Sequence, residues 1–256
     1  SLSERWPEHI LHIIEYGYSH DLNRWYERME YIPHGNLRQF IPWGYVSRPL
    51  VDTVMEEILK AIKVLHDNGI VHRDLKPENI LVRSRNPLDL VFADFGMSTT
   101  LDASLSHKMT STIGGTIEYM APESFTDIDG KVITGKAVDF WAIGIMLYEM
   151  IFGQTPFHGI SPQMIGHTLA TKNVAIDEDI ISEEFRSYVP MLRVLLDRDP
   201  SKRTIGDLIV DAEATPAAAR KKPKPQLADV SETEKDKELK KLEIELEKYK
   251  QENFRL

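Results

Sequence analysis

One stretch of the sequence, AVDFWAIGIMLYEMIFG at residues 137–153, limits the folds open to this chain more than any other stretch. A surface helix carries apolar residues on one face, whereas this stretch is apolar at nearly every position. Other parts of the chain must therefore cover such a helix on all sides to remove it from water. The stretch predicts a domain built around one central, buried helix.

The chain also contains elements that could cover this helix. Residues 51–69, VDTVMEEILKAIKVLHDNG, have apolar residues at helical spacing and end in glycine, which is typical of a helix with its C-terminal cap. Further helical patterns lie near residues 161–170, 183–196 and 204–213. Residues 10–16 and 25–32 look like two strands joined by a polar loop, and short strands are expected beside GIVHRDLKPENILV and LDLVFADFG.

Composition excludes several classes of protein. The 256 residues are 42% hydrophobic and 28% charged, which is ordinary for a soluble chain with one substantial core or two small ones. The net charge of −9 argues against a nucleic-acid partner, and no apolar run is long enough to cross a membrane. The absence of cysteine excludes disulfides and thiolate metal sites, and it agrees with an intracellular location, in cytoplasm or nucleus.

The composition changes after Ala212. Residues 212–230 are rich in Ala, Pro and Lys, so we expect a linker there. Residues 231–256 return to a helical pattern. Positions spaced alternately by three and four residues follow the a/d rule of a coiled coil: Leu239, Leu242, Leu246, Tyr249, Asn253 and Leu256. Two interpretations remain for this C-terminal helix: a short coiled coil through which the chain self-associates, and a solvated helix with balanced charge.

Polar side chains gather unexpectedly in GIVHRDLKPENILV, residues 69–82, where Asp74, Lys76 and Asn79 are surrounded by apolar residues. Charged groups are costly to place among Ile, Val and Leu unless they are paired or used. The motif is followed by DFG at residues 94–96, APE at 121–123, DFWAIG and a late arginine. Motifs in this order and rough spacing resemble those of the eukaryotic-type protein kinase superfamily, and of serine/threonine kinases in particular.

The resemblance covers most of the chain, about residues 8–211, and implies its fold class. We expect an α+β, protein-kinase-like fold with a mainly α-helical large lobe and a truncated β small lobe, followed by the C-terminal helix. The small-lobe remnant, two strands and a hinge, would occupy residues 1–32, and the large lobe residues 33–211. The linker and the C-terminal helix described above complete this division of the chain.

The resemblance also implies a catalytic role for the polar residues. Asp74 would orient the substrate hydroxyl and accept its proton, and Lys76 would stabilise the charge of the transferring phosphoryl group. Asn79 and Asp94 of DFG would hold Mg²⁺, which prefers oxygen ligands and bridges the phosphates of ATP. Thr116 resembles the threonine that contacts the catalytic Asp and Lys in serine/threonine kinases. The alternative is that Asp74, Asn79 and Asp94 only cap turns.

The same resemblance implies where ATP binds. The backbone of Glu30 and Ile32 would bind the edge of the adenine, and Leu81 and Ala93 would form the floor of its pocket. Asn36 stands where many relatives have an acidic residue that meets the ribose. Its amide could still form a hydrogen bond with a hydroxyl, but the charge is gone.

Regulation and specificity can also be compared with the family. Arg73 would bind a phosphate on the activation loop, since a guanidinium binds phosphate bidentately. Thr112 lies four residues before Thr116, the usual place for that phosphate, although hydroxyl residues are common in any loop. Glu78 and Glu149 match positions that favour basic residues before the phosphorylated residue in some relatives, but both are too common in the family to decide specificity.

Other residues resemble structural members of the family. Glu123 and Arg203 resemble a buried ion pair that anchors the activation segment, and Asp139 resembles the carboxylate that holds the catalytic-loop backbone. His72, Phe95 and Ile14 resemble apolar residues that link the two lobes. Met29 would be the gatekeeper at the back of the adenine pocket.

Some parts of a complete kinase are missing from the sequence. The 29 residues before Glu30 contain no G-x-G-x-x-G motif and no strand lysine of the VAIK type, and the helix glutamate that positions this lysine is also absent. We therefore expect apolar surface around Ile14, Met29 and Phe95 to be exposed.

Three interpretations follow from this incomplete pattern. The chain is a fragment of an active serine/threonine kinase, or a non-catalytic scaffold acting through its large lobe and C-terminal coiled coil, or a chain whose missing lobe comes from another chain. We favour the first, because Asp74, Lys76, Asn79 and Asp94 have the residue types that the chemistry requires. The missing initiating Met favours it too. The expected ligands are ATP, Mg²⁺ and a protein substrate.

Overall fold

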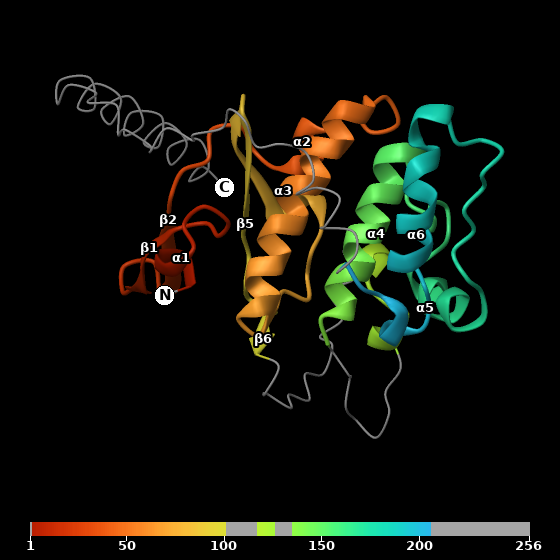
Figure 1. Cartoon of the computed structure of the whole chain (residues 1–256). Helices are drawn as coiled ribbons and strands as arrows, with labels where there is room; N and C mark the ends of the chain where they lie inside the picture. Colours follow the sequence, from red (N-terminus) through yellow and green to blue (C-terminus); the bar gives the residue numbers. More distant parts are fainter. Residues whose placement is uncertain (1, 101–116, 126–134, 206–256) are drawn as a thin grey trace, which may run out of the picture. The chain divides into compact units, whose positions relative to one another are not determined.

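The computed structural model of the chain describes residues 2–100, 117–125 and 135–205 (Figure 1). These residues all belong to the first of two compact units, residues 1–215, and the second unit is residues 216–256. The predicted linker, the C-terminal helix and most of the helical pattern at residues 204–213 lie outside the described residues.

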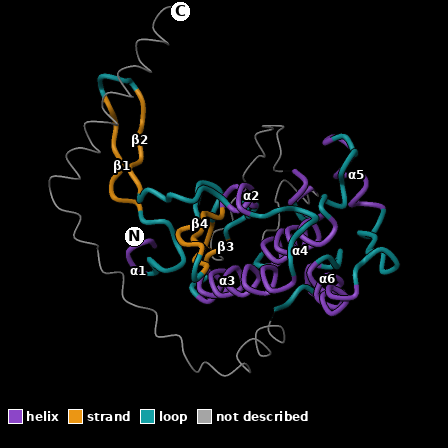
Figure 2. Tube along the Cα trace, turned by 90° about the horizontal axis from the view of Figure 1, so that it is seen from above, coloured by secondary structure: helices purple, strands orange, loops and turns teal. Residues whose placement is uncertain are grey.

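The predicted central helix is confirmed as α4 (Ala137–Phe152). Most of its residues are buried, and several are fully buried: Trp141, Ile143, Ile145, Met146 and Leu147. Helices α3 (Arg48–Asp67) and α6 (Val189–Leu195) pack against it, and Figures 1 and 2 show the three helices next to one another. Gly144 permits the close approach of α6, because a Cβ atom there would lie 2.8 Å from the Cβ of Leu195.

The end of α4 meets the loop that follows α2 (Leu37–Phe40). Gly153 is the C-cap of α4, with φ of 79°, and its N–H donates to the carbonyl of Glu149 at 2.8 Å. Gly44 of the loop has φ of 78°, in the left-handed region that favours glycine. A Cβ atom on either glycine would lie 3.0 Å from the Cα of the other, so two stretches of backbone are in direct contact here.

Two predicted helices differ from the observed ones at a proline. Helix α3 begins at Arg48, three residues before the predicted start, because Pro49 fits the first turn of a helix. The single helix predicted for residues 183–196 is instead a 3-10 turn, η4 (Glu183–Tyr188), followed by α6, whose first turn contains Pro190. A proline has no N–H to donate, so it marks the start of a new helix rather than the middle of an old one.

The remaining helical elements are short, apart from α5 (Pro162–Thr171) near the predicted residues 161–170. They are α1 (Leu2–Arg5), α2, η1 (Pro77–Asn79), η2 (Ile117–Tyr119), η3 (Pro122–Phe125) and η5 (Pro200–Lys202). Within the described ranges, none of the helices combines the length and the apolar character that crossing a bilayer requires.

The strands of the described residues pair antiparallel in twos. The pairs are β1 (Ile13–Ser19) with β2 (Arg24–Met29), β3 (Ile70–Val71) with β6 (Thr99–Thr100), and β4 (Ile80–Arg85) with β5 (Leu88–Phe92). The first strand was predicted at residues 10–16 and begins later. Residues 9–11 instead lie beside β5, where the N–H of Leu11 donates to the carbonyl of Phe92 at 2.9 Å.

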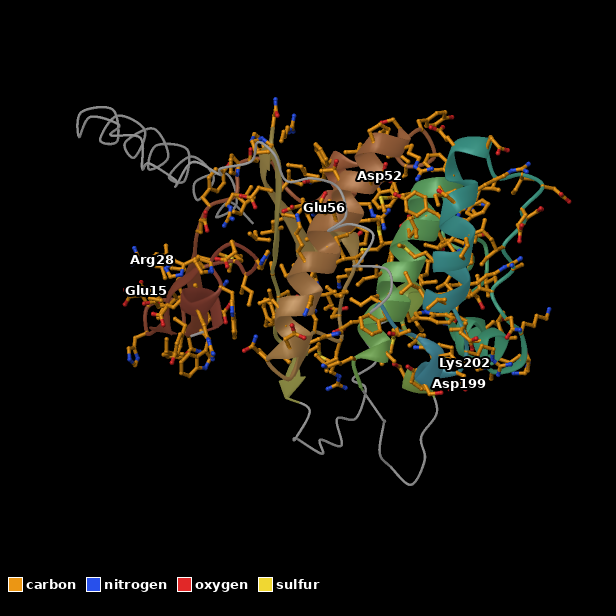
Figure 3. All side chains as sticks on the ribbon, in the orientation of Figure 1. Glu15, Arg28, Asp52, Glu56, Asp199 and Lys202 are labelled. Atoms are coloured by element: carbon orange, nitrogen blue, oxygen red, sulfur yellow. The ribbon has the colours of Figure 1, made fainter. Side chains whose placement is uncertain are left out.

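The β1–β2 hairpin exposes apolar side chains along both strands. Tyr16 is 78% exposed and Trp25 is 74% exposed, and the predicted exposure of Ile14 and Met29 is confirmed at 49% and 43%. An exposed ion pair, Glu15 with Arg28 at 3.1 Å, joins facing residues of the two strands (Figure 3). Such a pair adds little stability, and an isolated hairpin is marginally stable by itself.

Candidate active site

The backbone of the HRD motif, residues 72–74, is held by a buried carboxylate. Asp139 of α4 is 1% exposed, and its oxygens accept hydrogen bonds from the N–H groups of His72 at 2.9 Å and Arg73 at 2.8 Å. His66 Nε2 of α3 lies 2.8 Å from the same carboxylate. Arg73 has φ of 70°, a conformation that a non-glycine residue keeps only where its surroundings hold it. The predicted contact between Asp139 and this loop is confirmed.

The structure brings Asp74, Lys76 and Asn79 together. Oδ2 of Asp74 accepts hydrogen bonds from Lys76 Nζ at 3.0 Å and from Asn79 Nδ2 at 3.1 Å. Asn79 Nδ2 also donates to the backbone carbonyl of Asp74 at 2.8 Å. The other oxygen, Asp74 Oδ1, is buried and has no hydrogen-bond partner within the described part of the chain. A buried acceptor without a partner is unusual, so Asp74 Oδ1 is the oxygen at this site that can still accept a hydrogen bond.

Two hydrogen bonds to backbone carbonyls connect this loop to the segment that carries Asp94. The N–H of Ala93 donates to the carbonyl of Asn79 at 2.9 Å, and His72 Nε2 donates to the carbonyl of Ala93 at 3.1 Å. Burial lowers the pKa of His72, against the opposing effect of nearby carboxylates, so its ring stays neutral at neutral pH. Asp94 itself is exposed and has φ of 60°.

Two of the residues that resemble apolar links between the lobes, His72 and Phe95, pack against each other with ring centroids 4.8 Å apart. Phe95 is half-buried and packs against the core, so the expected exposure is wrong for this residue. Its packing against the neutral His72 explains the difference, because this contact does not need the small lobe. Ile14, in contrast, is exposed in the hairpin, as described above.

The donor set agrees with magnesium held between protein and phosphates. Because the amide nitrogen of Asn79 donates to Asp74, its amide oxygen is the atom that could ligate a cation. The exposed carboxylate of Asp94 is a second oxygen group that could ligate the cation. No group of three or more His, Asp or Glu residues in the described ranges could hold a metal ion alone. Magnesium commonly takes one or two protein ligands and completes its shell with substrate phosphates and water.

The predicted adenine residues come together beside β4 and β5. Ile32 and Leu81 pack against a small apolar cluster formed by Leu11, Val91 and Ala93. The N–H of Glu30 donates to the carbonyl of His12 at 2.9 Å, which leaves the Glu30 carbonyl as the acceptor for an adenine amino group.

Asn36 has a structural task that the sequence analysis did not identify. It caps α2: its side-chain oxygen accepts from the N–H of Gln39 at 3.1 Å, and its own N–H donates to Gln39 Oε1 at 3.3 Å. The spacing of Asn36 and Gln39 is the signal of a capping box and could have shown this. The amide nitrogen of Asn36 remains the group that could donate to a ribose hydroxyl.

The predicted ion pair between Glu123 and Arg203 is confirmed. Two hydrogen bonds of 2.7 Å join the guanidinium to the carboxylate, and Arg203 also donates to the carbonyl of Ala137 at 2.9 Å. The side chain of Arg203 is fully buried and lies over the ring of Trp141. A buried arginine with this many acceptors fixes η3 against the start of α4.

The predicted regulatory residues are described only in part. Arg73 is half-buried, and burial lowers the pKa of its guanidinium. No described residue accepts a hydrogen bond from that guanidinium. Thr112 and Thr116 lie outside the described residues.

Arg38 and Tyr119, to which the sequence assigned no role, form a further cluster with Glu78 and Glu149. Arg38 of α2 forms ion pairs with Glu78 of η1 at 2.9 Å and with Glu149 of α4 at 2.6 Å. The hydroxyl of Tyr119 donates to Glu149 at 2.6 Å. These four residues are far apart in the sequence, so no spacing indicates that they meet.

The chain is similar to known proteins over most of its length. Residues 6–212 match the sequence model of a family described as "Protein kinase domain". Calcium/calmodulin-dependent protein kinase type I of Schizosaccharomyces pombe is 39% identical over 171 residues, which are 66% of this chain and 49% of that protein.

Two other fungal proteins are similarly related. Serine/threonine-protein kinase SCH9 of Candida albicans is 41% identical over 147 residues, 57% of this chain and 17% of that protein. Calcium/calmodulin-dependent protein kinase cmkB of Emericella nidulans is 41% identical over 165 residues, 62% of this chain and 39% of that protein. The match therefore spans less than half the length of each relative.

Proposed function

The chain belongs to the protein kinase domain family, and on this basis we propose that it transfers the γ-phosphate of ATP to a serine or threonine hydroxyl of a protein substrate. The observation that carries the proposal is the pair of oxygens of Asp74. One is held by Lys76 and Asn79, and the other is buried without a described partner. An oriented carboxylate with one unused oxygen is suited to accept a hydrogen bond from a hydroxyl.

In this mechanism each residue has one task. Oδ1 of Asp74 accepts the hydrogen bond of the substrate hydroxyl, orients its oxygen and takes its proton late in the reaction. The ammonium of Lys76, whose Nζ lies 3.0 Å from Asp74 Oδ2, would stabilise the negative charge of the transferring phosphoryl group. Asn79 keeps the carboxylate in place through its amide nitrogen. Asp139 fixes the backbone from which Asp74 projects.

The nucleotide and the metal are held by the residues next to this loop. The amide oxygen of Asn79 and the carboxylate of Asp94 would be the protein ligands for Mg²⁺. Bound Mg–ATP supplies the phosphoryl group and a cation that offsets its negative charge. Ile32, Leu81 and Ala93 form the apolar surface for the adenine. The backbone of Glu30 and Ile32 would bind the adenine edge, and the amide of Asn36 would donate to the ribose.

An assay of phosphate transfer tests this function directly. The purified chain is incubated with radiolabelled ATP, Mg²⁺ and a mixed serine/threonine protein substrate, with Asp74→Asn as the matched variant of nearly equal size. We expect the variant to lose about a hundred- to ten-thousandfold of the rate, the usual range for a general base. Transfer that is equal in both proteins contradicts the proposal. The absence of any transfer that depends on Asp74 favours a non-catalytic scaffold instead.

We also propose that a phosphate on Thr112 regulates the chain by binding Arg73. A half-buried guanidinium without a described acceptor can form charge-assisted hydrogen bonds to a phosphate. Thr116 would then contact Asp74 and Lys76 in the ordered segment. Mass spectrometry of the active protein should find phosphate on Thr112, and Thr112→Ala should reduce activity. Unchanged activity without phosphate at this residue contradicts the proposal.

Self-association is proposed for residues 231–256, through a parallel coiled coil. The support is the a/d spacing of Leu239, Leu242, Leu246 and Tyr249, with Asn253 at a late a position, a residue that sets the register. Sedimentation of a peptide of residues 230–256 should show concentration-dependent association. A monomer at high micromolar concentration contradicts it.

A further inference from the structure

We propose that Arg38 determines which protein substrates the chain accepts, because it fills from within an acidic site that would otherwise bind a basic residue of the substrate. The inference rests on the proposed function, since it concerns a protein substrate lying along the catalytic loop. It predicts that this chain has no preference for arginine at the substrate position that faces Glu78 and Glu149.

The first support is the geometry of the cluster. The guanidinium of Arg38 donates from Nε to Glu78 Oε1 at 2.9 Å, from Nη1 to Glu149 Oε1 at 2.6 Å and from Nη2 to Glu149 Oε2 at 3.1 Å. The contact with Glu149 is therefore bidentate, the strongest arrangement between a guanidinium and a carboxylate. A substrate arginine could form the same bidentate contact with Glu149 only by displacing Arg38.

The second support is that the surroundings hold Arg38 in this position. The indole ring of Trp43 lies 4.4 Å from the guanidinium, and Trp43 Nε1 donates to the carbonyl of Arg38 at 2.9 Å. Burial by itself lowers the pKa of Arg38, but hydrogen bonds to Glu149 and Glu78 outweigh it and raise the pKa overall. Arg38 is therefore a fixed, permanently charged part of the site.

The third support is the difference between the two carboxylates. Glu149 is 7% exposed and needs a cation nearby, since an isolated buried carboxylate is very costly. Tyr119 also donates to it, and burial raises the pKa of this hydroxyl, which keeps its proton. The side chain of Glu78, in contrast, is 43% exposed. Solvent thus reaches the carboxylate of Glu78, whereas Arg38 covers the carboxylate of Glu149.

The position of the cluster relates it to the substrate. Glu78 follows Asp74 by four residues in the same loop, and Lys76 between them contacts Asp74. An extended substrate advances about 3.3 Å per residue, so residues close to the phosphorylated one pass this part of the loop. With Arg38 in place the cluster carries one formal negative charge, whereas Glu78 and Glu149 alone would carry two. Removing the charge of Arg38 should therefore create a site for a basic side chain.

Peptide binding without ATP tests this inference separately from catalysis. Fluorescent serine peptides carry arginine at one of the five positions before the serine, and each has a twin with citrulline, which keeps the shape and removes the charge. Their affinities for the full chain are measured by fluorescence anisotropy. For the native chain and for Arg38→Lys, we expect each arginine peptide and its twin to differ by about threefold or less, since only an exposed carboxylate is available.

For Arg38→Met we expect one arginine peptide to bind about tenfold tighter than its twin, because two carboxylates then accept charge-assisted hydrogen bonds. Arg38→Gln, whose amide can still donate to Glu149 and support the fold, should show a gain of the same direction. Circular dichroism checks that both variants are folded.

A purely structural role for Arg38 would change stability but not the ratio between twins. A tenfold arginine preference in the native chain overturns the inference. So does the absence of a gain in a folded neutral variant, including the case in which neither twin binds. Loss of transfer in Asp74→Asn does not bear on this ratio, so the inference and the proposed function can fail independently.

Discussion

At the scale of single residues, the arrangement depends on a few buried polar atoms. Asp139 illustrates this, because one carboxylate accepts from two backbone N–H groups of the HRD motif and lies 2.8 Å from His66 Nε2. Asp139 and His66 are 1% and 4% exposed, so water cannot replace the carboxylate in these contacts. The conformation of the loop therefore depends on this single side chain.

Replacing Asp139 by alanine should lower the free energy of unfolding by about 3–5 kcal/mol, the usual cost of removing one partner of a buried charged contact. Urea denaturation of the purified variant measures the change. Asp179→Ala is the control, because Asp179 is exposed and its loss should change stability by about 0.5 kcal/mol or less. An Asp139→Ala protein as stable as this control would contradict the assigned contact.

A second prediction concerns His72, whose pKa burial lowers below the ordinary value of 6.5. Below that pH the unfolded chain binds a proton at this residue and the folded chain does not, so protonation favours unfolding. The free energy of unfolding should therefore fall as the pH falls from about 7 to 5.5, by at most about 1.4 kcal/mol per pH unit from this residue.

The His72→Gln variant should show a smaller slope over the same pH range, because its amide does not titrate. His158→Gln, the same substitution at an exposed histidine, serves as the matched control. Equal slopes in the native chain and in His72→Gln would argue against a neutral, buried His72.

At the scale of elements, sequence patterns predict the helices and strands whose formation depends only on their own residues. The apolar run of α4 and the helical spacing of α3 are local properties, so both helices were predicted, although Pro49 shifted the start of α3. The first strand was misplaced because residues 9–11 pair with Phe92 of β5, a partner that no local pattern reveals. The motif residues were identified through their resemblance to a family. The Arg38 cluster was missed because it forms only in the folded chain.

The hairpin of β1 and β2 gives a prediction at this scale. Tyr16 and Trp25 are largely exposed, so replacing both with lysine should remove an apolar surface at little cost in packing, mainly the ring contact of Trp25 with Tyr18. We expect the double variant to self-associate less than the native chain in sedimentation at equal concentration. Its free energy of unfolding should change by about 0.5 kcal/mol or less. Identical sedimentation of the two proteins would show that this surface is not what drives association.

At the scale of the whole molecule, the given sequence lacks a motif that a complete kinase uses to bind the phosphates of ATP. The chain offers Asn79, Asp94 and the apolar surface proposed for the adenine, but it contains no G-x-G-x-x-G motif to cover the phosphates. Water that reaches the phosphates raises the local dielectric constant and weakens the interactions on which the transition state depends. Each missing donor typically costs about a hundred- to a thousandfold in rate, and several such losses need not add.

The purified chain should therefore bind Mg–ATP weakly and transfer phosphate very slowly. Isothermal titration with Mg–ATP measures the first, and the radiolabelled assay measures the second. Fast turnover that Asp74→Asn abolishes would contradict this prediction. It would mean that a segment without the usual motif, or a second chain, covers the phosphates.

The contact between Gly44 and Gly153 has a consequence for how this family member could diversify. Neither glycine carries a charge, but Gly44 is the neighbour of Trp43, which holds Arg38. A methyl group on either glycine would push the loop away from the end of α4 and move Trp43 with it. On the proposal that Arg38 selects the substrate, one inherited change from glycine to alanine would redirect that choice while every acidic, basic and catalytic residue stays the same.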